Sequence, residues 1–281
     1  MTKVADAYVE IRADSRKLQS GLSKAVGTTK GAATQMKSSL AGVGRMFGAI
    51  GGVAAGAFAF KAMIGGVMSF EDKMTKSLAI VSGLTESTAK RMRAAALEIT
   101  RATTFSADQA AEAYFFLASA GLNAEQQMAS LPVVARFAQA GNFDLALATD
   151  LLTDAQSALG LKSADTAKHM ENLARVSDVL AKANVLANAT MQQFSEALTN
   201  RAGAALKVLN KDVEEGVAVL AALADQGVKG VGAGQQLFMA LRDLQSAANK
   251  NEEAFIAHGI AVYDAAGNVR NMADILGDLE G

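Results

Sequence analysis

Histidine, cysteine and serine side chains are the first places to look for catalysis, and here they offer little. The chain has two histidines, His169 and His258, 89 residues apart, and no cysteine. Disulfides, thiolate zinc sites and a cysteine nucleophile are therefore excluded. A serine nucleophile needs a histidine that an acid positions. We expect His169 to be solvated on a polar helix face and His258 to end a helix, where its charge suits the helix dipole.

Carboxylates and glycine-rich loops give no stronger signal. Glu214 and Glu215 are adjacent, and neighbours on a helix point about 100° apart, so they do not flank one bond. The stretch Gly227–Gly234 reads GVKGVGAG, but without a preceding strand or a Gly-Lys-Ser/Thr ending it predicts a linker between helices. Asp264 and Asn268 lack the acidic spacing of a calcium loop. We therefore expect no catalytic residues, no cofactor site and no metal site, and predict that the chain is not an enzyme.

The composition predicts helices as the elements that carry these residues. Among 281 residues there are 59 alanines, one proline and no tryptophan, and the formal net charge is -1. Alanine has the highest helix propensity, and a single proline leaves few forced breaks. The balanced charge gives no overall attraction to nucleic acid. The fold class expected is mainly α.

Charge divides the chain into three expected regions. Residues 1–14 alternate in character and predict a short N-terminal strand. Residues 15–70 hold seven basic residues and no acid, and residues 71–281 therefore sum to -7. We expect residues 15–70 to form a basic helical arm and residues 71–281 to form an acidic, all-α body. An electrostatic surface on the arm is predicted for Arg16, Lys17, Lys24, Lys30, Lys37 and Arg45.

The arm also contains a glycine- and alanine-rich apolar segment, Met46–Phe70. Of its 25 residues, 17 are apolar, six are glycine and one, Lys61, is charged. Glycines recur at every fourth position and form one smooth stripe on a helix, the small-xxx-small arrangement that lets backbones approach closely. This predicts a glycine-zipper helix at Gly44, Gly48, Gly52 and Gly56.

Several uses of the arm remain open from sequence alone. The apolar segment suits a helix packed against copies of itself, a hinge, a membrane-active helix or a constitutive membrane anchor. Its uncharged run of 15 residues, 46–60, is shorter than the roughly 20 that span a bilayer, although Lys61 could snorkel. The basic residues suit anionic lipid headgroups, DNA phosphates in a confined space, or a solvated face. Without aromatic residues among them, they predict no base-stacking platform and no sequence-specific contact with nucleic acid.

Capping residues and a proline predict where several helices of the body begin or break. We expect Ser69 and Ser87 to begin two of them, and Pro132 to kink or divide a third. The methionines and the pair Phe115–Phe116 are expected in the core. Three segments have capping-box spacing: Ser106–Gln109, Asn123–Gln126 and Thr190–Gln193.

The last 21 residues predict a β-hairpin followed by a helix. Residues 261–270 predict a small β-hairpin around Ala265-Ala266-Gly267, and residues 272–279 a final helix. The chain then stops at Gly281 without a closing element, which favours a longer parent protein.

Eight segments carry a family resemblance, and they occur in order along nearly the whole chain. They are Ala5–Asp14, Leu18–Leu22, Phe70–Met74, Ala110–Leu122, Leu131–Val134, Asp144–Asp150, Phe194–Leu198 and Gly259–Asn268. Together they are similar to the N-terminal region of tail tape-measure proteins of long-tailed bacteriophages.

The resemblance implies a structural role. Such a protein threads the lumen of the tail tube, sets tail length during assembly and, in some members, helps the genome through the host membrane. It implies the tail tube protein, tail assembly chaperones and tail tip proteins as partners, with self-association in the lumen and contact with the host membrane at ejection. It also implies the virion as location, the host cytoplasm during assembly and the host inner membrane at ejection. A rival interpretation is a pore-forming effector that inserts the glycine-rich helix into a membrane.

Overall fold

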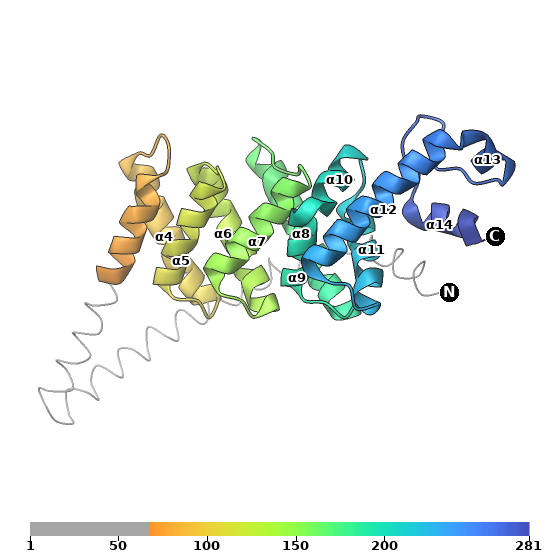
Figure 1. Ribbon diagram of the computed structural model, residues 1–281. Coiled ribbons are helices and arrows are strands. Elements are labelled where there is room, and N and C mark those ends of the chain that lie inside the picture. Colours follow the sequence, from red (N-terminus) through yellow and green to blue (C-terminus); the bar gives the residue numbers. More distant parts are fainter. Residues whose placement is uncertain (1–67, 281) are drawn as a thin grey trace, which may run out of the picture.

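The computed structural model describes residues 68–280, and these are mainly helical (Figure 1). A helix over 68–79 comes first. It is followed by α4 (Glu86–Ala102), α5 (Ala107–Ser119), α6 (Ala124–Gly141), α7 (Leu145–Ala158), α8 (Thr166–Leu186), α9 (Met191–Ala197), the short π-helix η1 (Leu198–Ala202), α10 (Gly203–Val208), α11 (Val213–Asp225), α12 (Gly230–Lys250), α13 (Glu252–Ala257) and α14 (Met272–Glu280).

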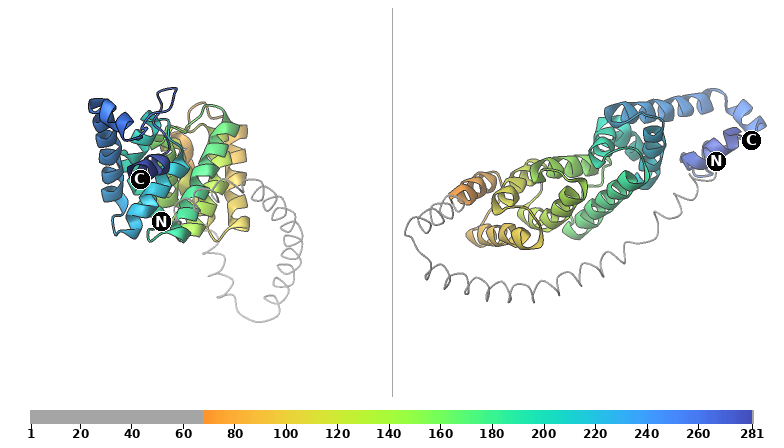
Figure 2. Two further views of the ribbon diagram at one scale, coloured as in Figure 1. Left: turned by 90° about the vertical axis from the view of Figure 1, so that its right-hand side faces the viewer. Right: turned by 90° about the horizontal axis from the view of Figure 1, so that it is seen from below.

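The helices form an elongated stack in which each packs on helices close to it in the sequence. Helix α5 packs on α4, α6 and α7, and α8 packs on α6, α7, α9 and α11. Figures 1 and 2 show the row from three sides, with α13 and α14 at the end opposite the helix over 68–79. This is the quasi-one-dimensional arrangement of helical repeat proteins, whose units bury their apolar faces against their neighbours.

Side-chain contacts along the stack recur at a nearly constant sequence separation. Lys73 pairs with Glu112, and Arg175 with Glu214, both 39 residues apart. Met170 lies 40 residues after its hydrogen-bond partner Ser130. A helical hairpin of about 40 residues is a common size for stacked α-repeats. The body therefore advances by one hairpin about every 39 residues.

Two helices of these hairpins, α5 and α7, end in the same way. After α5 the backbone N–H of Leu122 donates to the carbonyl of Leu117, and after α7 that of Leu161 donates to Gln156. The glycine just before each donor residue has a positive φ, 82° at Gly121 and 69° at Gly160. These are Schellman ends, in which glycine takes a left-handed conformation that most residues avoid. They fix where α5 and α7 stop.

One apolar core runs along the stack, and a second, smaller one lies at its C-terminal end. The largest fully buried side chains of the main core include Tyr114, Phe137 and Phe194. The small core holds Ala248, Val262, Val269 and Ile275. We call the part around this second core, residues 251–280, the C-terminal lobe.

The predicted helix starts are partly right. The three capping boxes at Ser106, Asn123 and Thr190 are confirmed. The start at Ser87 is wrong by two residues, because Thr85 accepts a hydrogen bond from the Thr88 N–H and caps α4. Ser69 does not begin its helix: it lies within it and bonds to Asp108 on α5.

Pro132 does not divide α6, which is one element of 18 residues. Proline removes one backbone donor from the helix, but Leu131, Val133 and Val134 beside it are buried. Packing of this face against the neighbouring helices holds the segment together. Tertiary contacts here outweigh the lost hydrogen bond.

The linker predicted over Gly227–Gly234 is shorter than expected, because α12 begins at Gly230. Over 261–270 the described backbone forms one isolated antiparallel bridge, between Tyr263 and Val269. The predicted N-terminal strand and the arm up to residue 67 lie outside the described residues. Within residues 68–280, no helix combines the length and apolar character needed to cross a membrane.

Candidate functional site

The residues predicted to form functional surfaces lie outside the described part of the chain. This holds for the glycine stripe at Gly44, Gly48, Gly52 and Gly56. It holds equally for the basic surface at Arg16, Lys17, Lys24, Lys30, Lys37 and Arg45. Within residues 68–280, the candidate sites are clusters of polar contacts between stacked helices. We call each cluster a joint.

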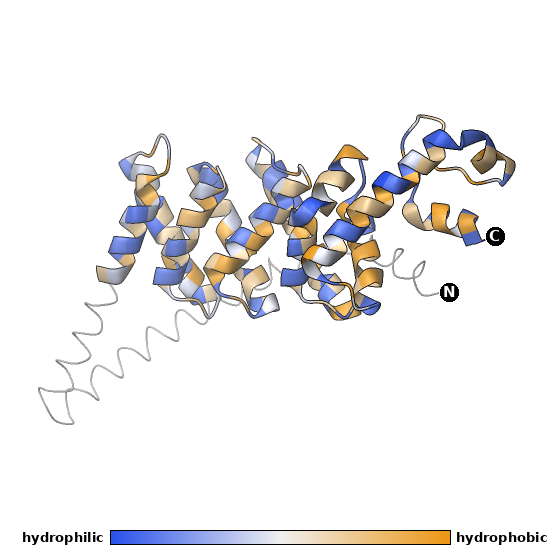
Figure 3. Ribbon diagram, viewed as in Figure 1, coloured by the Kyte–Doolittle hydropathy of each residue, from blue (hydrophilic) through white to orange (hydrophobic). Residues whose placement is uncertain are grey.

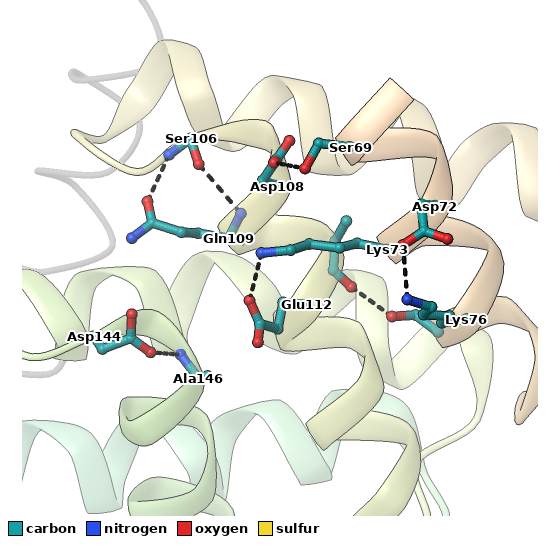
Figure 4. A network of polar contacts seen from close by, with 12 residues as sticks. Ser69, Asp72, Lys73, Lys76, Ser106, Asp108, Gln109, Glu112, Asp144 and Ala146 are labelled. Atoms are coloured by element: carbon teal, nitrogen blue, oxygen red, sulfur yellow. Dashed lines mark hydrogen bonds and ion pairs between the residues drawn. The ribbon is translucent and has the colours of Figure 1, made fainter. Parts of the chain in front are cut away.

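The first joint attaches the helix over 68–79 to α5 (Figure 4). Lys73 Nζ lies 2.8 Å from Glu112 Oε2, and Ser77 Oγ donates to the buried carbonyl of Ala111 at 2.6 Å. The hydrogen bond with Glu112, followed by charge contributions that include Asp108, raises the pKa of Lys73. Lys73 and Glu112 are each more than a third exposed, so their ion pair stabilises the joint only modestly.

Arg175 forms the second joint, between α8 and the start of α11. Its Nε donates to Glu214 Oε1 at 2.6 Å, while Nη2 reaches both Glu214 Oε2 and Asp212 Oδ1. A guanidinium fork bound by two carboxylates is a specific geometry that lysine cannot reproduce. These hydrogen bonds raise the pKa of Arg175.

The third joint is a buried ion pair that holds the C-terminal lobe. Lys211 Nζ lies 3.2 Å from Glu215 Oε1, with side chains only 6% and 9% exposed. Glu215 also accepts the backbone N–H of Met272 at 2.7 Å. Lys211 donates to the carbonyl of Arg270. Lys211, just before α11, and Glu215 on α11 thus bind the two backbone groups, Arg270 C=O and Met272 N–H, at the start of α14.

A kinked backbone lies at the centre of the stack. Asn200 (φ -90°, ψ 75°) and Arg201 (φ 75°, ψ -34°) leave helical geometry inside η1. A Cβ on Gly234 of α12 would lie 2.2 Å from the Ala197 carbonyl oxygen and 2.7 Å from that of Asn200. Glycine at this position therefore allows α12 to pack directly on the kink. The Arg201 guanidinium covers the ring of Phe238, 5.4 Å from its centroid, a cation–π contact.

His169 contradicts its predicted solvated position. It is fully buried, and neither ring nitrogen has a hydrogen-bond partner among residues 68–280. Burial, with the charge of Lys162 as a smaller cause, lowers its pKa. His169 is the fourth residue of α8, and its backbone carbonyl accepts a hydrogen bond from Gln156 Nε2 of α7.

The adjacent carboxylates Glu214 and Glu215 contribute to packing. Glu214 and Glu215 each have a cationic partner, Arg175 and Lys211. Between residues 68 and 280, no group of three or more His, Cys, Asp or Glu side chains is arranged to hold a metal ion. Phe115, expected in the core, is 43% exposed.

Comparison with known proteins places the chain among proteins of phage tails. Residues 93–281 match a family described as phage-related minor tail protein. The chain belongs to this family. It is 30% identical over 211 residues to the tape measure protein of Pneumococcus phage Dp-1 and 28% identical over 282 residues to the probable tape measure protein of Escherichia phage P2. The predicted relationship to tape-measure proteins is confirmed. No solved structure matches the chain.

The minor tail protein chain spans only part of these curated relatives. The alignment with the phage Dp-1 protein covers 75% of the chain and 18% of that relative. The alignment with the phage P2 protein covers 100% of the chain and 33% of that relative.

Sequence reasoning missed the joints of this minor tail protein, although one signal was present. Gly83, Gly121 and Gly160 are separated by 38 and 39 residues, and a leucine follows each. A regular spacing of helix-ending glycines predicts a repeated hairpin. With that register, pairs such as Lys73 and Glu112 fall on neighbouring units.

Proposed function

We propose that this chain is a structural component of a phage tail, lies in the lumen of the tail tube and sets tail length during assembly. The observation that carries the proposal is the alignment of the whole chain with the probable tape measure protein of phage P2. The geometry supports the proposal, because the charged side chains between helices pair with one another and hold the helices together. Arg175 and Lys211, for example, have their charges committed to neighbouring helices.

This role implies partners along the tail. We propose contacts with the tail tube protein, tail assembly chaperones and tail tip proteins, and self-association within the lumen. The protein would occupy the host cytoplasm during assembly and the virion afterwards. Passage of the genome through the host inner membrane would involve the arm, with its glycines Gly44, Gly48, Gly52 and Gly56.

Removing one helical hairpin in frame tests length control. Deletion of residues 122–160 joins Gly121 to Leu161 and so retains the Gly-Leu sequence that ends α5. If the deleted part lies along the tube as helix, tails measured by electron microscopy should shorten by about 60 Å at 1.5 Å per residue. Duplication of the same residues should lengthen them by the same amount, and Glu171→Gln, an exposed change, should leave length unaltered. Equal tail lengths for deletion and duplication, with both proteins incorporated, would show that this part does not measure.

Peptide mass spectrometry of purified tails tests location. The proposal expects peptides of this chain in intact tails. Intact tails from the source phage without any such peptide would refute it and favour the pore-forming effector.

A further inference from the structure

One residue of the kinked segment is strained. Arg201 has φ 75° and ψ -34°, a conformation that residues other than glycine rarely adopt. Residues 191–208 contain no proline, so the sequence does not force a break in the helix there. Strain of this kind persists only where the surrounding contacts determine the backbone shape. The cause of the kink therefore lies outside the segment.

Two residues separate this segment from a continuous helix. Asn200 and Arg201 leave helical geometry. Four residues that flank them keep it, with φ between -59° and -65°: Ala197, Leu198, Ala202 and Gly203. Residues 191–208 also contain four alanines and two leucines, which favour helix. New backbone angles at Asn200 and Arg201 would therefore give one helix from Met191 to Val208.

Helix α12 supplies the contacts that hold the kink. It is amphipathic (Figure 3): its apolar residues Ala233 and Leu237 are buried, and the helix packs against α9 and η1. A Cβ on Gly234 would collide with the Ala197 carbonyl oxygen and would lie 2.7 Å from that of Asn200. With a ψ of 75°, the Asn200 carbonyl does not point along the helix axis, as it would at a ψ of about -42°. The close fit of α12 is therefore specific to the bent backbone.

The bulge also sets the register of the two halves of the segment. Before it, Phe194 is only 2% exposed in the core. After it, Leu206 occupies the space beside Gly216 of α11, where a Cβ would collide with Leu206 Cδ1. A π-bulge inserts one residue into a helix, so a continuous α-helix would rotate Leu206 by about 100° relative to Phe194. Straightening must therefore break one of these two packing contacts.

We propose that residues 191–208 form a two-state hinge, which is bent when α12 is docked and a continuous helix when α12 is released. Docking α12 and bending the hinge are one cooperative event, because the bent backbone is strained without α12 and α12 fits only the bent backbone. Release opens the stack between α9 and α12 and keeps the packing among α4, α5, α6 and α7. The hinge is a property of this fold and does not depend on the proposed role in length control.

Substitutions at Arg201 test the bent state in the full chain. Arg201→Gly and Arg201→Ala both remove the cation–π contact with Phe238, so the two variants differ in backbone preference. Glycine adopts a positive φ without strain, whereas alanine is favoured in a continuous helix by about fivefold in the equilibrium constant. We expect the amide hydrogens of α12 to exchange at least fivefold more slowly in Arg201→Gly than in Arg201→Ala. Equal rates, or slower exchange with alanine, would overturn the strained bend.

Two substitutions in α12 test the released state. Gly234→Leu forces a side chain against the backbone of the hinge. Gly232→Leu is the matched control, because Gly232 is exposed on the same helix and its nearest neighbour lies 3.9 Å from the position of a Cβ. In the full chain we expect Gly234→Leu to abolish the amide protection of α12 and to retain that of α5 and α7. Gly232→Leu should leave the protection of all three helices unchanged.

The carbon-13 resonances of the Asn200 and Arg201 Cα atoms report the shape of the hinge in the same samples. Such resonances move downfield when a residue becomes helical, so both should move downfield in Gly234→Leu and stay in place in Gly232→Leu. Release of α12 without this shift would overturn the proposal, as would loss of amide protection within residues 191–208. Unfolding of α5 and α7 in Gly234→Leu would overturn it too, since the hinge predicts that these helices keep their packing.

Discussion

Glu215 and Met272 are 57 residues apart, yet the carboxylate of the first accepts the backbone N–H of the second at 2.7 Å. The same carboxylate lies 3.2 Å from Lys211 Nζ. An N–H at the start of α14 that has no partner within the helix is thus satisfied by a buried charge from α11. The attachment of the C-terminal lobe depends on this one side chain more than on any exposed ion pair of the described stack.

Glu215→Ala should release the C-terminal lobe. It leaves the Lys211 ammonium buried without its counter-charge, and breaking a buried pair in this way costs about 3–5 kcal/mol. We expect amide hydrogens in 262–280 to exchange much faster while those of α6 and α8 keep their protection. Glu253→Ala, at an exposed position of α13, is the control. Unchanged exchange in both variants would contradict the assigned role of Glu215.

Gly234→Ala should destabilise the body strongly. The added methyl group would meet backbone atoms of Ala197 and Asn200, which cannot rotate away, and overpacking of this kind costs about 1–3 kcal/mol or more. Gly232→Ala, on the same helix, has its nearest neighbour at 3.9 Å. It should be neutral or stabilise by up to about 1 kcal/mol through helix propensity. Thermal unfolding of the two variants should separate them in opposite directions, and similar midpoints would argue against close packing at the kink.

Stability should fall as the pH drops below the ordinary histidine pKa of 6.5, because of His169. Burial lowers the pKa of His169 in the folded chain, so the unfolded chain binds the proton more readily. Acid therefore stabilises the unfolded state relative to the folded state. This contribution is complete above pH 6.5 and is lost between that value and the lower folded pKa. His169→Leu should flatten the stability profile from pH 7 down to about pH 5.5. Urea midpoints measured across that range provide the check, and a profile unchanged by His169→Leu would be evidence against it.

Gly48→Leu combined with Gly52→Leu tests the glycine stripe. The two leucines would obstruct close helix packing and should impair genome delivery in a plaque assay. Residues 71–281 should stay folded, as judged by the unfolding midpoint of the body. Normal infectivity of the double variant would eliminate the glycine-zipper hypothesis.

Local chemistry could be predicted from the sequence, and long-range packing could not. Ser106, Asn123 and Thr190 were identifiable as caps because the donor and acceptor lie within four residues. The burial of His169 could not be predicted, since it depends on which face of α8 meets α6 and α7. The kink at Asn200 and Arg201 was missed because neither residue signals a break: α12 holds it in place through Gly234.

The near-neighbour packing of the stack has a mechanical consequence. A pull along its axis acts first on the outermost hairpin, whose contacts do not extend through the whole molecule. Each released hairpin of about 39 residues lengthens the chain by roughly 130 Å when extended. In a single-molecule pulling experiment the body should give way in a series of small steps at modest force. It should regain its fold in stages when the load is removed.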